Sequence, residues 1–485
     1  MALDSVTNKI KQAVFSGIAV RVVAHVFNFG LGVILARILS PSDFGVFAIA
    51  MLFTGIAGAL ADFGLLSGLL QRRRLHEVHY CSVYIIHLIA ALLLTLALLC
   101  STPIISSVFS VVGHESEISA LFYVVFLNAI SGVPQVVYKK RYEHARIGYL
   151  RLISSAVAGI VAVALSILGW GMWAVVLQCI TSALLFFILM AAILPWHSKL
   201  LFSWKAVAQL AQFSGAMYVS KLLDAIFSRF DIVLIAKITN IDILGAYQRA
   251  KAVSSIAADM FFLSMLDVFF PFLSSISSSG KRFNRIFLIA LNVMAFVSIY
   301  ISFLLPLVAV DLVVMIYGVD WIVAGEALEI ISMISFSYPV SMLLTMAVSA
   351  KGRSVQFLLL EIIKKGLLVI HFGAGFLYGY EVFLWLIILR GWVAVFINIY
   401  FSARETGVAY FALLYPIVLH ALIGGSAWFV SYELFEKGEP GKLLDIWSVI
   451  IVYSIVYFGL AALCRSIGLG AMWRLVRQRF LGGVC

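Results

Sequence analysis

Apolar stretches of about twenty residues recur along the whole chain, and they restrict its architecture more than any other feature. A helix of about that length is needed to cross the hydrocarbon core of a bilayer. Charged residues make up only 12% of the 485 residues, whereas a soluble globular protein has about twice that fraction. We therefore predict an all-α polytopic membrane protein without a large soluble domain.

The hydropathy pattern predicts about fourteen transmembrane helices. They lie near residues 14–36, 43–70, 80–100, 118–138, 150–168, 171–194, 213–236, 244–274, 286–308, 323–348, 355–377, 381–401, 409–431 and 446–464. The first follows a short basic segment without a small-residue cleavage site, so we expect a retained helix and not a signal peptide. The five cysteines are widely spaced and odd in number, which favours packing roles over a metal site or disulfides.

Lysine and arginine residues collect in alternate connections between these predicted helices. The main groups are 72–74, 139–151, 281–285 and the arginines between 465 and 479. Because cytoplasmic loops carry the excess of basic residues, we predict that these connections and both termini are cytoplasmic. The net charge of +11 then reflects contact with anionic lipid headgroups, and no nucleic-acid partner is expected.

One stretch of sequence occurs twice. "LARILSPSDFGVF" at 35–47 aligns without gaps with "IAKITNIDILGAY" at 235–247, so that Gly45 meets Gly245 and Arg37 meets Lys237. A second echo, at an offset of 207 residues, aligns Arg146 and Gly159 with Arg353 and Gly366. We infer that the first six predicted helices are duplicated in the next six.

A duplication of six helices has consequences for the architecture. Because six is even, both copies enter the membrane from the same side, as in transporters built from parallel repeats, and the two lobes enclose a cleft. The predicted domains are residues 1–200, residues 201–405, and residues 406–485 with two further helices and a basic tail.

The turn in the first copy contains a signal for the start of a helix. Ser40 is a favourable N-cap residue, Pro41 suits the first helical position, and Asp43 follows Ser40 by three residues. This is the pattern of a capping box. We predict a structural role for these residues.

The repeated stretches resemble a known family. Residues 35–73, "LARILSPSDFGVFAIAMLFTGIAGALADFGLLSGLLQRR", are similar to the start of Wzx-type polysaccharide flippases of the multidrug/oligosaccharidyl-lipid/polysaccharide (MOP) superfamily, in particular its colanic acid exporter branch. The similarity continues through 233–253, 268–276 and 316–333. The resemblance implies a V-shaped bundle of two six-helix lobes with two extra helices. It also implies outward movement of a polyprenyl-pyrophosphate-linked oligosaccharide across the bacterial inner membrane, for cell-surface polysaccharide synthesis.

Charged side chains inside the predicted helices are candidate functional residues, because an ionised group at the bilayer centre costs about 2.5–3.5 kcal/mol on insertion scales. Two helices carry polar stripes at helical spacing. The first stripe is Arg21, His25, Asn28 and Gly32, and the second is Lys221, Asp224, Ser228 and Asp231 with Arg229 beside it. The other candidates are Asp62, Arg249, Lys251, Asp259, Asp267, Glu361, Lys364, Lys365 and Arg390.

A pyrophosphate headgroup needs several convergent cationic donors, preferably arginine. We therefore predict a substrate-binding set and an ion-coupling set: Arg21, His25, Asn28, Lys221, Arg249 and Arg390 for the substrate, and Asp62 or Asp224 for a coupling ion. Structural pairing is the alternative where helical spacing brings opposite charges together. The candidate pairs are Glu361 with Lys364 or Lys365, and Lys221 with Asp224.

Two other functions compete with glycan export. A cation-coupled multidrug or toxin exporter of the same superfamily needs a carboxylate in the first lobe, and Asp62 keeps this alternative open. A membrane enzyme acting on glycan lipids needs a large outer loop, and the predicted outer loops are short.

No catalytic triad, metal constellation or phosphate loop is visible in the sequence, so we predict no enzyme activity and no cofactor. Asp62-Phe63-Gly64 spells a kinase signature without the accompanying loops. The expected partners are the lipid-linked substrate and membrane lipids, with a polysaccharide polymerase and chain-length proteins as candidates.

Overall fold

The computed structural model describes residues 20, 22–72, 74–141, 143–193, 199, 201–277, 279–351, 354–435 and 443–470. These residues form helices and connecting turns, with no strand among them. The prediction of an all-α fold is therefore confirmed. By its internal contacts the chain divides into two compact units, Met1–Gly245 and Ala246–Cys485.

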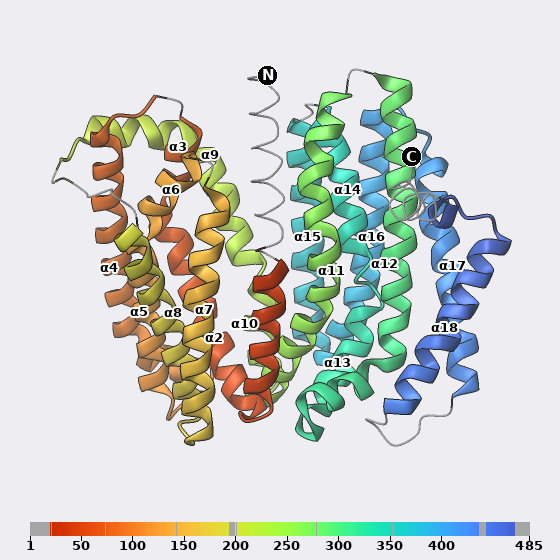
Figure 1. The fold of residues 1–485 in the computed structure, drawn as a ribbon, viewed down its shortest axis with the longest axis horizontal. Helices are drawn as coiled ribbons and strands as arrows, with labels where there is room; N and C mark the ends of the chain where they lie inside the picture. The colour runs from red at the N-terminus through yellow and green to blue at the C-terminus, as the bar shows by residue number, and fades with distance from the viewer. Residues whose placement is uncertain are drawn as a thin grey trace, which may run out of the picture. The chain divides into compact units, whose positions relative to one another are not determined.

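The first unit begins with a helix at Val22–Ala36. It continues with α2 (Pro41–Asp62), α3 (Leu65–Gln71), α4 (Glu77–Val108), α5 (Glu115–Ile130), α6 (Gly132–Lys140), α7 (His144–Ile167), α8 (Met172–Ile193), α9 (Trp204–Phe227), α10 (Phe230–Ile238) and the start of α11 (Ile241–Ser275). The long helices of this unit form a bundle (Figure 1), in which α4 packs against α5 and α7 packs against α8.

The second unit contains the rest of α11 and a further series of helices. These are α12 (Gly280–Tyr317), the short helix η1 (Val319–Trp321), α13 (Ile322–Ser332), α14 (Ser337–Ala350), α15 (Ser354–Tyr378), α16 (Tyr380–Thr406), α17 (Tyr410–Leu434) and α18 (Leu443–Leu463). Both α17 and α18 pack on α12. Tyr457 and Tyr453 on α18 donate hydrogen bonds to the carbonyls of Phe296 (2.8 Å) and Tyr300 (3.1 Å), which fixes α18 to α12.

Ten helical segments among the described residues are long and apolar enough to cross a membrane, and two of them join neighbouring helices, at Glu115–Lys140 and Val319–Ala350. Large apolar side chains lie on their outer surfaces, with Ile104 66%, Ile160 70% and Leu463 80% exposed. Exposed apolar side chains of this kind are suited to contact with lipid. The chain is a multi-pass membrane protein, whereas the number of fourteen spans stays a prediction.

Three further helices are long but do not belong to these ten. They are α9, α11 and α15, with 24, 35 and 25 residues. These helices hold much of the charge singled out above, namely Lys221, Asp224, Arg249, Lys251, Glu361, Lys364 and Lys365. Because charge in contact with lipid is costly, helices of this kind are expected to face protein or a water-filled cavity.

Two of the predicted helices are interrupted. The predicted helix 43–70 divides into α2 and α3 at Phe63 and Gly64, which both have left-handed backbone conformations (φ 46° and 70°). The predicted helix 213–236 divides into α9 and α10 at Ser228 and Arg229. Neither segment contains proline, and the average hydropathy of each is high enough for one span although polar residues lie at both breaks, so the sequence predicted continuous helices.

Candidate functional site

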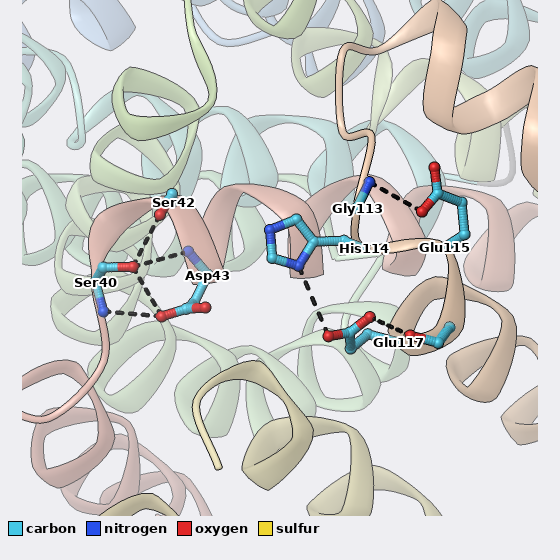
Figure 2. Close-up of polar contacts among 8 residues, drawn as sticks. Ser40, Ser42, Asp43, Gly113, His114, Glu115 and Glu117 are labelled. Atoms are coloured by element: carbon cyan, nitrogen blue, oxygen red, sulfur yellow. Dashed lines mark hydrogen bonds and ion pairs between the residues drawn. The ribbon is translucent and has the colours of Figure 1, made fainter. Parts of the chain in front are cut away.

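The turn in the first copy of the repeat carries the expected cap. The Asp43 N–H donates to Ser40 Oγ (3.3 Å), and the Ser40 N–H donates to Asp43 Oδ2 (3.0 Å). Figure 2 shows the two side chains facing each other at the start of α2, and Pro41 occupies the first turn. The predicted capping box is therefore confirmed. In the second copy Asn240 Oδ1 accepts a hydrogen bond from the Ile243 N–H (2.9 Å), which is an N-cap of simpler design.

Figure 2 also shows a second helix start, at the first turn of α5. Glu115 accepts a hydrogen bond from the Gly113 N–H (2.9 Å), and His114 Nδ1 lies 3.8 Å from Glu117. Carboxylates at this position interact favourably with the N-terminal end of the helix dipole. These contacts are structural and are unrelated to the predicted substrate site.

The two copies of the repeat pack against each other through their aligned glycines. A Cβ added to Gly45 would overlap the carbonyl oxygen of Ile241, and a Cβ added to Gly245 would overlap that of Pro41. The contact is reciprocal, because Pro41 and Ile241 are aligned positions of the repeat, and each lies against the glycine of the other copy. This is the pattern of a local two-fold axis between the two turns. Only glycine allows two backbones to approach so closely.

Asp62 occupies the last position of α2, immediately before the break. It is half-buried, and its Oδ1 accepts a hydrogen bond from the Leu66 N–H (3.0 Å), so it caps the start of α3. Gly64 lies against Tyr218 of α9, and a Cβ at Gly64 would be 2.7 Å from the Tyr218 Cβ. His87 of α4 bonds through Nδ1 to the Ala61 carbonyl (3.0 Å). The carboxylate predicted for ion coupling therefore also has a structural partner.

The polar stripe predicted on the first helix is only partly described. Arg21 lies outside the described residues. His25 and Asn28 are exposed on the helix Val22–Ala36. Asn28 Oδ1 accepts a hydrogen bond from Ser155 Oγ of α7, so this helix and α7 are joined by a polar contact.

The stripe predicted on the seventh helix is divided by the break between α9 and α10. Lys221 is exposed and donates a hydrogen bond to Ser67 Oγ of α3, and Asp224 is exposed on the same helix. Asp231 is buried in the first turn of α10. Arg229 donates to the Ala225 carbonyl (3.1 Å) and its guanidinium fills the space beside Gly55 of α2. The four residues of the predicted stripe therefore do not form one continuous surface.

The predicted site residues of the second unit lie on different helices. Arg249 on α11 is half-buried and interacts electrostatically with Tyr317 at the end of α12. Arg390 is half-buried in the middle of α16. On α15 the Lys364 ammonium lies 2.5 Å from Glu361, which confirms one of the predicted structural pairs. The side chains of Asp259 and Asp267 lie outside the described part of the chain.

The structure brings together charged residues that the sequence analysis had assigned to separate parts of the chain. Lys139 of α6 is within electrostatic range of Asp62, Lys221 and Arg151. Lys139 had been placed just after the predicted helix 118–138 and Arg151 at the start of the predicted helix 150–168, and both lie on helices in the structure. The sequence contained only a weak indication of this group. Gln135 and Lys139 are four residues apart, but the ends of helices near a basic stretch are poorly defined by hydropathy. Among the described residues no three His, Cys, Asp or Glu side chains are placed to hold a metal ion.

Fold and sequence together define the class of the protein as an all-helical, multi-pass membrane protein with charged residues inside its helices. Residues 34–326 match the family described as "Polysaccharide biosynthesis protein", which is more than half of the chain. The chain belongs to this family of polysaccharide biosynthesis proteins. The resemblance found in the sequence is thereby confirmed.

Two curated relatives are similar to the chain over part of their length. The succinoglycan biosynthesis transport protein ExoT of Rhizobium meliloti (strain 1021) is 24% identical over 302 residues, which cover 62% of this chain and 61% of ExoT. The lipopolysaccharide biosynthesis protein WzxC of Escherichia coli (strain K12) is 21% identical over 326 residues, which cover 64% of this chain and 65% of WzxC. The match therefore spans less than two thirds of either relative.

Solved structures show the same fold over most of the chain. The lipid II flippase MurJ in an inward closed conformation aligns with a TM-score of 0.71 at 15% identity, covering 94% of this chain and 98% of MurJ. An inward-facing multidrug resistance MATE family transporter of the MOP superfamily aligns with a TM-score of 0.62 at 15% identity, covering 81% of this chain and 96% of that protein. The MOP fold implied by the sequence resemblance is confirmed.

Proposed function

We propose that this chain is a flippase that moves a polyprenyl-pyrophosphate-linked oligosaccharide outward across the bacterial inner membrane. The observation that carries the proposal is the family match over residues 34–326. Both curated relatives take their names from polysaccharide or lipopolysaccharide biosynthesis, and one of them is named a transport protein. In this proposal both termini are cytoplasmic, and a polysaccharide polymerase and chain-length proteins are partners.

The chemistry of the substrate fits the cations inside the helices. A pyrophosphate carries about two negative charges and is bound best by several charge-assisted hydrogen bonds. Arg390 on α16 and Arg249 on α11 are half-buried guanidinium groups within long helices. We assign them, with Arg21, His25, Asn28 and Lys221, to substrate binding, while the polyprenyl chain stays in the lipid. Alternating access between parallel repeats then exposes the site to each side in turn.

A gene deletion tests the proposed substrate class. Deletion should stop export of the surface polysaccharide and cause lipid-linked oligosaccharide to accumulate in the inner leaflet, and the wild-type gene should restore export. The same strain should keep its resistance to cationic dyes. Loss of dye resistance with normal polysaccharide export would overturn the proposal.

Substitution at Arg390 tests the proposed site with a control on the same helix. Arg390→Lys should reduce export about ten-fold or more, because lysine cannot make the two parallel hydrogen bonds of a guanidinium. Arg404→Lys on α16 is the matched control, since Arg404 is exposed and lies 3.7 Å from Glu405. Arg21→Ala should reduce export similarly at normal membrane abundance. Full export by both the Arg390 and Arg21 variants would remove them from the site.

A multidrug or toxin exporter is the second candidate function. The half-buried carboxylate of Asp62 and the fold shared with a MATE family transporter favour it. This function predicts that Asp62→Asn abolishes dye efflux coupled to protons or sodium in membrane vesicles. A vesicle assay of dye efflux with wild-type protein separates the two functions directly.

A further inference from the structure

The break between α2 and α3 is strained and is not a requirement of the repeat. Phe63 has a left-handed backbone conformation (φ 46°), which residues other than glycine rarely adopt. Its side chain is 46% exposed, so burial of the ring gives little compensation. At the same offset of 200 residues, positions 263 and 264 lie within the continuous helix α11. A strained residue of this kind persists only where its surroundings hold it in place.

His87 of α4 is one of the side chains that hold the break. Its Nδ1 lies 3.0 Å from the Ala61 carbonyl oxygen, at the end of α2. Because a carbonyl oxygen only accepts, Nδ1 carries the hydrogen and donates it. The last carbonyls of a helix have no partner within that helix, and His87 is buried, with 6% of its surface exposed. The imidazole therefore completes the hydrogen bonding of α2 where the helix stops.

The other side of the same ring lies against a second helix junction. Gly132 is the first residue of α6 and is separated from the end of α5 by Ser131 alone. A Cβ added to Gly132 would be 3.0 Å from His87 Nε2 and 3.1 Å from its Cδ2, closer than an ordinary van der Waals contact. Since α4 runs unbroken past both junctions, one imidazole on a continuous helix contacts the points where two neighbouring helices are interrupted.

Beyond the break, α3 is held by α9. Tyr218 donates a hydrogen bond to the Leu60 carbonyl (3.4 Å), and its Cβ would lie 2.7 Å from a Cβ added to Gly64. After the end of α3, Arg72 donates to Gln209 Oε1 (3.0 Å). The buried side of α3 also shares an apolar core with α4, α6 and α9, and Figure 1 shows α3, α6 and α9 at the same end of the unit. The direction in which α3 leaves the break therefore determines how it packs on α9.

We propose that His87 is a positioning residue for export. It holds the end of α2 against the α5–α6 junction, which sets the direction of α3 and the place of α9, the helix that carries Lys221 and Asp224. His87 acts through these helices and does not itself contact substrate. The inference rests on the proposed function for the activity that is measured. The contact between the ring and Gly132 does not depend on transport, so it can be tested separately.

Two substitutions at His87 separate its two contacts. His87→Asn keeps a donor near the position of Nδ1, whereas His87→Gln moves the amide toward the position of Nε2 and leaves the Ala61 carbonyl without its donor. At equal membrane abundance, export of polysaccharide by His87→Asn should stay close to wild type, and export by His87→Gln should fall about ten-fold. Equal export by the two variants would overturn the positioning role.

His79→Gln is the matched control for these substitutions. His79 lies two turns earlier on α4, is also 6% exposed, and bonds through Nδ1 to the backbone, by accepting the His76 N–H (3.2 Å). Export by His79→Gln should stay close to wild type, because this residue contacts neither junction. A loss as large as that of His87→Gln would show that any buried histidine of α4 is equally sensitive, and would overturn the assignment to His87.

A double-variant cycle tests the ring contact by thermal unfolding in detergent. Gly132→Ala should lower the Tm by a few degrees, because the new methyl group meets the imidazole. In the His87→Asn background the same change should cost much less, since asparagine ends before the position of Nε2. Gly58→Ala is the control, because its Cβ would meet nothing within 4 Å, and its effect should be equal in both backgrounds. Additivity of Gly132→Ala and His87→Asn would remove the contact on which the proposal depends.

The wild-type protein separates failure of this inference from failure of the proposed function. If wild type exports polysaccharide and the two His87 variants are equal, only the positioning role is refuted. If wild type does not export polysaccharide, the proposed function is refuted and the positioning role with it, whatever the unfolding cycle shows.

Discussion

The two copies of the repeat, 35–47 and 235–247, form the same turn with different local chemistry. The first copy starts α2 with a capping box of Ser40 and Asp43, and the second starts α11 with Asn240 alone. The glycines at 45 and 245 are identical in both, and each meets the backbone of the other copy. The comparison teaches that the close backbone contact leaves no room for any side chain and therefore requires glycine in both copies. The helix cap, by contrast, can be made by different acceptor side chains.

The other end of the turn differs as well. Lys237 donates a hydrogen bond to the Val108 carbonyl, and its ammonium lies 5.3 Å from the centre of the Phe109 ring. The second copy is therefore joined to the end of α4 through the Lys237 ammonium.

The second echo in the sequence does not share this mirrored packing. A Cβ at Gly159 would be 2.6 Å from Leu31 of the first helix, whereas a Cβ at Gly366 would meet nothing within 4 Å. Gly45 and Gly245 therefore both allow a close backbone contact, whereas the aligned glycines Gly159 and Gly366 do not share one role.

The largest effect is expected from adding a methyl group at the glycine contact. Gly45→Ala and Gly245→Ala should each destabilise the protein by roughly 1–3 kcal/mol, because the new Cβ meets a carbonyl oxygen that cannot move freely. Thermal unfolding in detergent measures the change. Gly58→Ala is the control on the same helix, since nothing lies within 4 Å of its Cβ, and an equal loss there would contradict the explanation.

A double variant tests whether the two glycines form one contact. If either methyl group already separates the backbones, Gly45→Ala combined with Gly245→Ala should cost less than the sum of the single changes. The expected coupling is about 0.5–3 kcal/mol. Strict additivity in the same unfolding assay would show that the two sites act independently.

Exchange of the caps should have a smaller effect. Ser40→Ala and Asn240→Ala should each cost about 1 kcal/mol, because an N–H at the helix start loses its acceptor. Ser40→Asn, which copies the cap of the second repeat, should cost much less. If Ser40→Asn were as destabilising as Ser40→Ala, the caps would not be interchangeable.

The smallest effect is expected at Lys237. Lys237→Gln should cost about 0.5–1 kcal/mol through loss of the cation–π contact with Phe109. Lys237→Arg should retain most of the stability, since a guanidinium also interacts with an aromatic face. A neutral result for Lys237→Gln would mean that the ring contact adds nothing measurable.

Local features of this fold were predictable from the sequence, and non-local ones were not. The capping box at Ser40 and the pair Glu361–Lys364 follow from spacings of three residues within a single turn. The breaks at Phe63–Gly64 and Ser228–Arg229 coincide with polar residues that were interpreted as functional side chains within continuous helices. Alignment of the repeats singled out Gly45 and Gly245, but no sequence pattern says that two aligned residues touch each other.

The candidate site shows the same limit. Hydropathy placed Arg249 and Arg390 within helices, where the structure also has them. Lys139 and Arg151 were counted in one basic group at the cytoplasmic ends of the predicted helices 118–138 and 150–168, because a basic stretch after an apolar run normally marks the end of a helix. Their meeting with Lys221 and Asp62 joins helices more than sixty residues apart in the chain, and only the packing of the bundle reveals it.

The glycine contact also has a consequence for biosynthesis. Gly45 is translated 200 residues before Gly245, and a ribosome adds about 5–20 residues per second. The backbone at Gly45 is therefore synthesised about 10–40 seconds before the backbone that it contacts in the folded protein. Any other group that contacts Gly45 in that interval must dissociate before the turn at residues 241–245 can pack against it.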